Sequence, residues 1–281
     1  MQLAAITDEI SQDFEHALDV LLEYSAPGAE LRGLWGVNIA DLTDEQALRA
    51  RNALRERGMH VAALATPFFK CDLIQDAAAI RGRMHLAKAR GMGEQLTMLR
   101  RCCELAHAFD TDLIRVFTFW RQGDLSPVIE RQIVDAFAEP IKVAEEEDVT
   151  LVLENEHACY IGTGAEAARV LSEVNSPQLR AVWDPGNAYL AGELPYPAGY
   201  QEIRPFLRHI HVKDAVADGS GGYQWAVIGQ GDLNYTGQFE ALRKDGYDGF
   251  VSLETHYIPH GGTPEEGSRA CLAALQKMFN S

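Results

Sequence analysis

Residues 149–186, VTLVLENEHACYIGTGAEAARVLSEVNSPQLRAVWDPG, contain two apolar runs separated by a stretch with helical spacing. Residues 149–155 and 179–184 are short and rich in aliphatic side chains, whereas residues 165–174 carry apolar side chains three and four positions apart. A strand, a helix and a second strand in this order are the unit from which parallel sheets are built. The segment therefore predicts a β-α-β unit.

The same alternation extends along the whole chain. The predicted strands are near-continuous hydrophobic runs, typical of parallel strands buried on both faces, at residues 3–7, 29–35, 59–65, 112–119, 149–155, 179–184, 207–213 and 250–255. Predicted crossover helices lie at residues 44–57, 126–147, 165–174 and 265–279. Eight repeats predict one domain over residues 1–281, an α/β protein that closes into a (β/α)8 TIM barrel.

Two segments fit this pattern less simply. Residues 66–111 are too long for one connection, so we expect a loop followed by one long or broken helix, interrupted near residues 91–93. The run Gly229-Gln230-Gly231 either offers backbone amides to an anion or forms a turn. A doubly wound open sheet is the competing architecture, but no glycine-rich phosphate-binding fingerprint follows the first strand.

The composition excludes several classes of protein. Acidic residues number 41 against 25 basic ones, and the resulting formal net charge of −16 disfavours a nucleic-acid partner. No stretch approaches the length of a membrane span, and the first residues lack a secretory pattern. Five cysteines without a CxxC pair fit reduced thiols. We expect a cytoplasmic protein that acts on a small molecule and has neither a nucleic-acid nor a membrane partner.

Four predicted strands end in residues that can ligate a metal, namely Glu154, Asp184, His211 and Glu254. The carboxyl ends of the strands form the active-site face of such a barrel. Three carboxylates that converge there repel one another, and a divalent cation would relieve the repulsion. This oxygen-rich set with one imidazole predicts a single divalent ion, Mn²⁺ first, with Mg²⁺, Co²⁺ or Zn²⁺ as alternatives.

A plainer interpretation exists for each ligand taken alone. An acid at a strand end is more often a helix cap or a salt-bridge partner, and Asp184-Pro185-Gly186 could be only a turn. Because such residues end four consecutive predicted strands, a set of metal ligands is favoured over four unrelated caps or turns. His211 is preferred over His209 because it lies nearer the end of its strand, and His209 is expected to be a core histidine.

With these residues in place, the sequence resembles the sugar isomerase/epimerase superfamily of xylose isomerase-like barrels. The resemblance covers essentially the whole chain and rests on short motifs in order: TDEIS (7–11), AELR (29–32), IRVF (114–117), LEN (153–155), DPGN (184–187), HVKD (211–214), GQGD (229–232) and SLE (252–254). It implies that the four residues hold one ion, which binds adjacent oxygens of a hydroxy-ketone. It also implies that Glu154 and Glu254 are catalytic and move the proton on opposite faces of a metal-stabilised enediolate.

One departure from the family pattern bears on the reaction. Many members carry a histidine three residues after the strand-six aspartate, where this chain has Asn187, and asparagine cannot carry a proton at neutral pH. The expected activity is metal-dependent isomerisation or epimerisation of a sugar, sugar-like polyol or keto-sugar. A metal-dependent lyase or dehydratase on a keto-sugar or inosose is the alternative.

Two other classes are disfavoured. An apurinic-endonuclease-like phosphodiester hydrolase would gather three metals, and residues 32–35 and 63–66, which end strands two and three, supply no further ligands. A noncatalytic binding protein on a degenerate barrel would have no reason to keep the four-ligand set.

Six further residues are candidates for binding the substrate. His157 either binds or protonates substrate or is a solvent-facing loop residue, and Asn187 can hydrogen-bond a hydroxyl. Lys213 and Arg115 either bind a substrate oxygen or phosphate or pair with a ligand carboxylate.

The aromatic candidates are Trp120 and Phe68, which lie beyond strands four and three. They would form an apolar wall against a sugar ring, pack ordinarily at the rim, or contact a second copy of the chain in a homo-oligomer. Because no glycine-rich phosphate loop is evident, the expected substrate is unphosphorylated.

Overall fold

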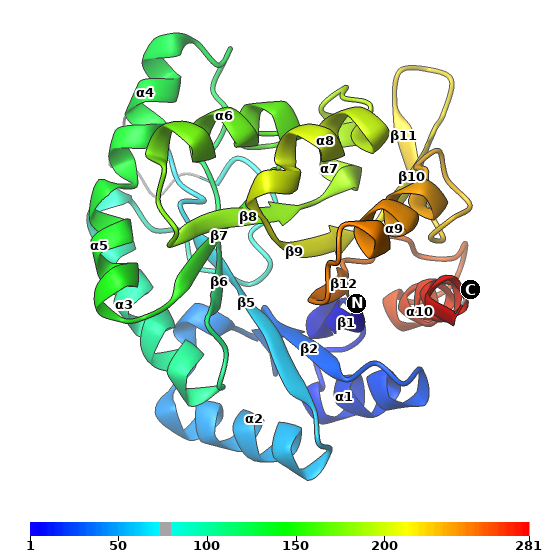
Figure 1. The fold of residues 1–281 in the computed structure, drawn as a ribbon. Helices are drawn as coiled ribbons and strands as arrows, with labels where there is room; N and C mark the ends of the chain where they lie inside the picture. Colours follow the sequence, from blue (N-terminus) through cyan, green and yellow to red (C-terminus); the bar gives the residue numbers. More distant parts are fainter. Residues whose placement is uncertain (74–79, 281) are drawn as a thin grey trace.

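A closed barrel of eight parallel strands lies at the centre of the computed structural model, which describes residues 1–73 and 80–280 (Figure 1). Going round the barrel, the strands follow the order β1-β12-β9-β8-β7-β6-β5-β2. Their bounds are β1 Gln2–Ile6, β2 Gly28–Leu31, β5 His60–Phe68, β6 Leu113–Val116, β7 Thr150–Glu154, β8 Leu179–Trp183, β9 Leu207–Val212 and β12 Phe250–Leu253. Each corresponds to one predicted strand, so the predicted TIM barrel is confirmed.

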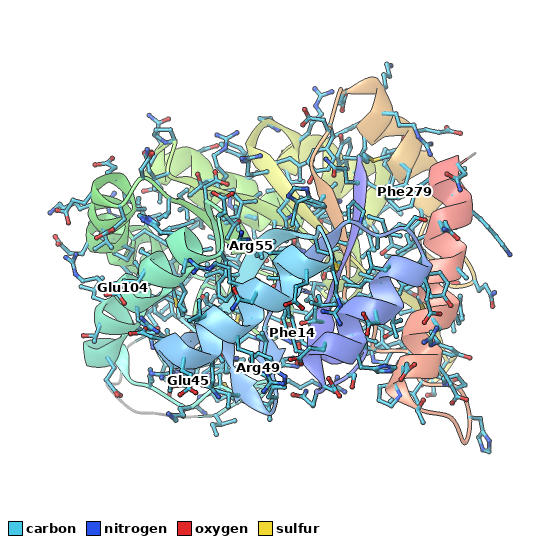
Figure 2. The ribbon with its side chains drawn as sticks, turned by 90° about the horizontal axis from the view of Figure 1, so that it is seen from below. Phe14, Glu45, Arg49, Arg55, Glu104 and Phe279 are labelled. Carbon is cyan, nitrogen blue, oxygen red and sulfur yellow. The ribbon has the colours of Figure 1, made fainter. Side chains whose placement is uncertain are left out.

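Helices surround the barrel (Figure 1). They are α1 Phe14–Glu23, α2 Asp44–Glu56, α3 Met92–Ala108, α4 Pro127–Ala136, α5 Ala138–Glu146, α6 Gly164–Val174, α7 Pro185–Leu190, α8 Tyr200–Ile203, α9 Tyr235–Lys244 and α10 Pro264–Asn280. In Figure 2, charged side chains such as Glu45 and Arg49 of α2 and Glu104 of α3 are exposed, whereas Phe14 of α1 is buried. The helices thus bury their apolar faces against the outside of the barrel.

Two short hairpins were not predicted. β3 Gly33–Leu34 pairs with β4 Val37–Asn38, so the predicted strand 29–35 leaves the barrel after Leu31 and its last residues belong to this hairpin instead. β10 Asp214–Ala217 pairs with β11 Tyr223–Ala226 directly after β9. The turn between β10 and β11 is rich in glycine, a composition that favours a hairpin.

The predicted helices needed two corrections. Residues 126–147 form two helices rather than one, because α4 ends at Ala136 and buried Phe137 separates it from α5. Gly91 does not interrupt a longer helix among the described residues, since it is the N-cap of α3. The predicted start at Ser126 is confirmed, because its hydroxyl accepts a hydrogen bond from the backbone N–H of Ile129 and Pro127 follows in the first turn.

The inner face of the barrel changes from apolar to polar along the strands. A small cluster of buried side chains from neighbouring strands, Ala63, Leu113, Val152 and Val182, is separate from the main core between strands and helices. Because side chains alternate between the two faces of a strand, the inward residues two positions further on are polar in β6, β7 and after β8: Arg115, Glu154 and Asp184. The register of the strands therefore gathers charged groups at the carboxyl end. Among the described residues, no helix is long and apolar enough to span a membrane.

Candidate metal and active site

The four predicted ligands come together at the carboxyl end of the barrel. One ligand atom from each of Glu154, Asp184, His211 and Glu254 lies within 4.8 Å of the others, and all four residues are buried. Asp184 also caps α7, because its Oδ1 accepts a hydrogen bond of 2.8 Å from the Asn187 backbone N–H. The aspartate is thus both a helix cap and a member of the cluster.

Three cations of the chain itself lie against these carboxylates. Lys213 Nζ is 2.7 Å from Asp184 Oδ2 and also contacts Glu254. Arg115 Nη1 lies 3.2 Å from Glu154 Oε2, and Arg32 Nη1 donates to Glu254 Oε1 at 3.0 Å. The carboxylates are therefore balanced in part by cations of the chain, and the pairing of Lys213 and Arg115 with carboxylates is the second of the two roles considered for them.

These contacts set the protonation of the acids. Burial opposes ionisation, but Lys213, His256 and Arg32 hold the pKa of Glu254 well below its ordinary value. Against the same burial, Arg115 and His211 lower the pKa of Glu154. Burial raises the pKa of Asp184 to about 6 even though Lys213 opposes the shift. Glu154 and Glu254 are consequently carboxylates at neutral pH.

His211 is held from behind by Glu30, a residue of β2. Its Nε2 lies 2.9 Å from Glu30 Oε1, and the other oxygen of Glu30 lies 2.8 Å from Nε2 of His209. The second imidazole nitrogen of His211, Nδ1, faces Glu154 Oε1 at 3.3 Å. Glu30 therefore fixes the ring so that Nδ1 points to the other three ligands, and His209 is a buried histidine satisfied by the same carboxylate.

Two oxygens of the cluster fit a metal ion. Among the described residues, Glu154 Oε2 and Asp184 Oδ2 are buried and have ion-pair contacts, to Arg115 at 3.2 Å and Lys213 at 2.7 Å, but no hydrogen bond of normal geometry. Buried polar atoms without a partner are rare in native proteins and call for an explanation such as a bound ion. Three carboxylates and one imidazole are also a donor set that divalent ions accept. The residues present thus fit the predicted ion.

A cavity of about 280 Å³ opens above the cluster and receives side chains from several loops. Three of the predicted substrate contacts, His157, Asn187 and Lys213, line it together with Glu254. Asn187 links His157 to Glu154 of the cluster below, because its Nδ2 donates to Glu154 Oε1 at 3.1 Å and its Oδ1 lies 3.0 Å from His157 Nδ1. Burial opposes the charged imidazole, yet Glu156, 3.0 Å away, raises the pKa of His157.

Of the three remaining predicted substrate contacts, one lines the cavity and two do not. Trp120 is buried and lines the cavity. Phe68 lies in the core against Phe69, with ring centroids 4.1 Å apart, and is not among the residues that line the cavity. Arg115 lies beneath the cavity, where it contacts Glu154 and donates to the backbone carbonyl of Ala65. Its position is that of a residue that orients a ligand carboxylate.

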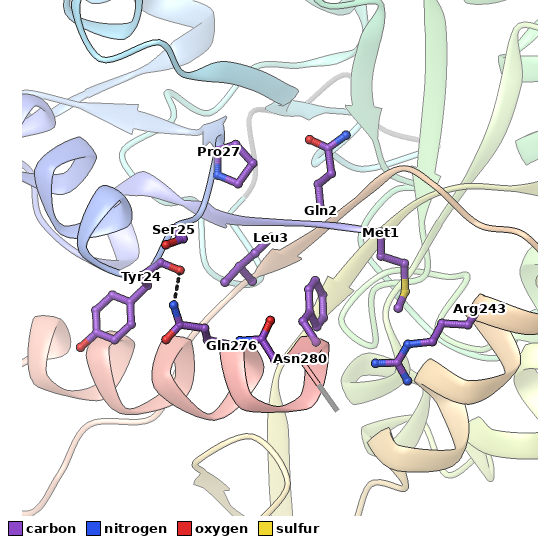
Figure 3. Close-up of a pocket in the computed structure, with 10 residues that line it drawn as sticks. Met1, Gln2, Leu3, Tyr24, Ser25, Pro27, Arg243, Gln276 and Asn280 are labelled. Atoms are coloured by element: carbon purple, nitrogen blue, oxygen red, sulfur yellow. Dashed lines mark hydrogen bonds between the residues drawn. The ribbon is translucent and has the colours of Figure 1, made fainter.

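A larger cavity, of about 520 Å³, lies at the other end of the barrel (Figure 3). It is lined by the first residues of β1 and the end of α10, among them Gln2, Gln276 and Arg243. None of its lining residues is an acid or a histidine, and Gln276 is already hydrogen-bonded to the backbone carbonyl of Tyr24. The smaller cavity is therefore the one with the chemistry of an active site.

Several residues at the site had no role assigned from the sequence. Glu30 is one, although a glutamate inside a buried apolar strand is itself a signal. Arg32 holds Asp8 and Glu9 as well as Glu254. Trp225 of β11 reaches the cavity and packs against His256, with ring centroids 4.8 Å apart. No periodic pattern marks such loop residues, since their position depends on the fold of the hairpin.

Comparison with known proteins agrees with this geometry. The family model described as "Xylose isomerase-like TIM barrel" matches residues 18–278. An inosose dehydratase of Lacticaseibacillus casei is 25% identical over 151 residues, which are 49% of this chain and 50% of that protein. The chain thus aligns with about half the length of the curated relatives that it matches.

Solved structures share the fold over nearly the full length. The IOLI protein, whose crystal structure contains a bound zinc atom, is 18% identical, with a TM-score of 0.76 over 99% of this chain and 98% of that one. A D-allulose 3-epimerase from Methylomonas sp., solved with D-allulose, is 14% identical, with a TM-score of 0.73 over 99% and 97%. At these identities the likeness shows the fold alone.

Proposed function

Since the chain belongs to the xylose isomerase-like TIM barrel family, we propose that it is a metal-dependent enzyme that enolises a small polyhydroxylated keto substrate and isomerises or epimerises it. One observation carries the proposal. Two ionised carboxylates, Glu154 and Glu254, meet Asp184 and His211 within 4.8 Å, directly beneath a cavity. A divalent ion bound there would polarise adjacent oxygens of a hydroxy-ketone. Zinc bound to the IOLI protein supports a metal of this kind.

The residues of the chain then have distinct tasks. Glu254 lines the cavity, so its carboxylate can accept the proton beside the substrate carbonyl. Glu154 lies deeper and is held by Asn187 and Arg115, which orient it to carry a proton on the other side. Lys213 reaches the cavity from beneath and can donate a hydrogen bond to a substrate oxygen.

A specific observation favours dehydration as a second candidate function. Expulsion of a hydroxyl group needs a proton donor, and His157 lines the cavity with its pKa raised by Glu156. Asn187 cannot serve in its place because an amide does not titrate. The similarity to an inosose dehydratase over half of the chain supports the same alternative.

Exchange of hydrogen with solvent tests the proposal. Chain loaded with Mn²⁺ is incubated in D₂O with a panel of ketoses and keto-polyols, and the products are analysed by NMR and mass spectrometry. Deuterium at a carbon beside the carbonyl, lost in Glu254→Gln, is the expected result. An isomer of equal composition then indicates isomerase or epimerase, and loss of water indicates dehydratase. If the metal-loaded chain turned over no member and exchanged no hydrogen, the proposal would be rejected.

A further inference from the structure

The cavity above the ligand set carries positive charge on one wall, although the chain as a whole has a formal net charge of −16. Lys70, Arg81 and Arg83 all line this wall. Arg81 is already paired, since its guanidinium donates two hydrogen bonds of 2.7 Å to the buried Asp72. Among the described residues, neither Lys70 nor Arg83 has a carboxylate partner that accepts two such hydrogen bonds. These two cations can therefore attract an anion in the cavity.

Lys70 is a buried cation with few close polar partners among the residues that the structure describes. Its side chain is 6% exposed, and the ammonium lies 4.2 Å from the ring centre of Phe117. An ammonium can donate three hydrogen bonds, normally of 2.7–3.2 Å. Within residues 1–73 and 80–280, its polar neighbours are the Arg83 carbonyl at 3.4 Å and Glu156 Oε2 at 3.5 Å, both beyond that range. Donor capacity therefore remains on a group for which burial is costly.

Glu156 does not neutralise this wall fully. Its carboxylate is shared between Lys70 and His157, which lies closer, at 3.0 Å. The guanidinium of Arg83 is exposed and makes no ion pair with any other residue that the structure describes. Lys70 and Arg83 thus both line the cavity, and Lys70 lies against the apolar rings of Phe117 and Trp120, where the low local dielectric strengthens its attraction for an anion.

We propose that the substrate carries an anionic group, a carboxylate or a phosphate, which binds between Lys70 and Arg83 while its hydroxy-ketone end reaches Glu254. Glu254 and Lys70 line one cavity of about 280 Å³, so one small molecule can contact both. This inference rests on the proposed function, because it assumes that the reacting molecule occupies this cavity. It narrows the substrate from polyhydroxylated molecules in general to sugar acids or sugar phosphates.

Matched pairs of ligands test the anion site. Binding is measured by titration calorimetry in EDTA, first for D-gluconate against D-glucitol and then for D-glucitol 6-phosphate against D-glucitol. In each pair the carbon skeleton is the same and only the anionic group differs. Because hydrogen bonds to charged groups contribute about 1.5–3 kcal/mol, the anionic member of one pair is expected to bind roughly 10–100-fold more tightly. The pair in which the anionic member binds more tightly shows whether the site prefers a carboxylate or a phosphate.

Substitutions of Lys70 and Arg83 test whether these residues cause the preference for the anionic ligand. Lys70→Met keeps the length of the side chain and removes the ammonium, and Arg83→Gln changes an exposed residue, so the fold remains available even where Lys70→Met destabilises it. Each is expected to reduce the preference by about tenfold. Lys88→Met is the control, since this exposed lysine pairs with Asp41 outside the cavity.

Equal binding of charged and neutral members, or a preference that survives in Arg83→Gln and Lys70→Met, would overturn the inference. Failure of the proposed function remains distinguishable, because it shows in metal binding and hydrogen exchange, whereas this titration is carried out without metal.

Discussion

Glu30 is a buried residue outside the four-residue cluster that holds one of the predicted ligands, His211. Its carboxylate accepts from the imidazoles of both His209 and His211 and has no exposure to solvent. Burial opposes its ionisation, but the two histidines hold the pKa of Glu30 well below its ordinary value. A carboxylate behind a ligating histidine keeps the ring in one orientation and increases its basicity, which is a common arrangement in metal sites.

Glu30→Gln should weaken metal binding while the fold persists. A glutamine can present its carbonyl to only one of the two imidazoles and turns its amide group toward the other, so His211 is no longer held as before. We expect the dissociation constant for Zn²⁺ to rise roughly 10–100-fold, the usual effect of removing such a partner. Calorimetric titration measures it, with the exposed Glu45→Gln as control. An unchanged dissociation constant in a variant with native circular dichroism would show that Glu30 does not orient the ligand.

His85 offers a prediction about pH. It lines the cavity, and burial together with nearby Arg32 lowers its pKa to about 2. In the unfolded chain a histidine takes up a proton near pH 6.5, whereas folded His85 stays neutral, so its burial costs stability as the pH falls below 6.5. Between pH 7 and pH 5 this amounts to about 2 kcal/mol.

The substitution His85→Asn should remove this loss of folding stability between pH 7 and pH 5. Asparagine suits the position, because the backbone there has a positive φ of 46° and asparagine tolerates this region. We expect the free energy of unfolding in urea to fall between pH 7 and pH 5 by about 2 kcal/mol more in the native chain than in the variant. Identical pH dependence in the two proteins would mean that His85 can be protonated in the folded state.

The elements after β9 explain why the run Gly229-Gln230-Gly231 is a turn and not an anion site. The carboxylate of Asp214, in β10, accepts the backbone N–H groups of Gly229 and Gly231 at 2.7 and 3.0 Å. A Cβ on Gly231 would lie 2.2 Å from Asp214 Oδ1, and Gly229 has a φ of +79°. Glycine is thus required at both positions, and their amides are not available to a ligand.

Asp214→Ala should therefore loosen this loop and lower stability. Four backbone N–H groups, those of Ala215, Gly229, Gly231 and Leu233, lose a carboxylate acceptor. We expect the free energy of unfolding in urea to decrease by about 2–4 kcal/mol, in line with hydrogen bonds to charged groups. Asp124→Ala, at an exposed position before α4, is the control and should change it by less than about 0.5 kcal/mol. Equal effects of the two substitutions would contradict the role of Asp214.

At the level of elements, the sequence predicted what depends on local pattern. All eight barrel strands could be located because each is a compact apolar run, and the start of α4 because Ser126-Pro127 has the chemistry of a helix start. The separation of α4 from α5 at Phe137 was missed although Pro140, in the first turn of α5, is a recognisable signal of a helix break. The β10–β11 hairpin was missed although its glycine-rich turn is a recognisable signal.

For the whole molecule, the barrel explains why the four strand-end residues could be grouped from the sequence. Parallel strands bring their carboxyl ends to one rim, so a ligand on each of four strands converges without knowledge of any contact. The partners of those ligands follow no such rule. Glu30 and His209 lie 179 residues apart, and Lys213 reaches Asp184 from the end of the neighbouring strand β9. The partners that balance the charges at the rim therefore could not be predicted from the sequence and were identified only in the structure.

Metal binding by the four-residue set tests the central claim most directly. The purified chain is stripped with EDTA, titrated with Mn²⁺ and Zn²⁺, and compared with the double variant Glu154→Gln/Glu254→Gln and with the exposed control Glu45→Gln/Glu104→Gln. One divalent ion per chain in the native protein and the control, and none in the double variant, is the result that the account predicts. Absence of binding in the native protein, or equal binding in the double variant, would contradict it.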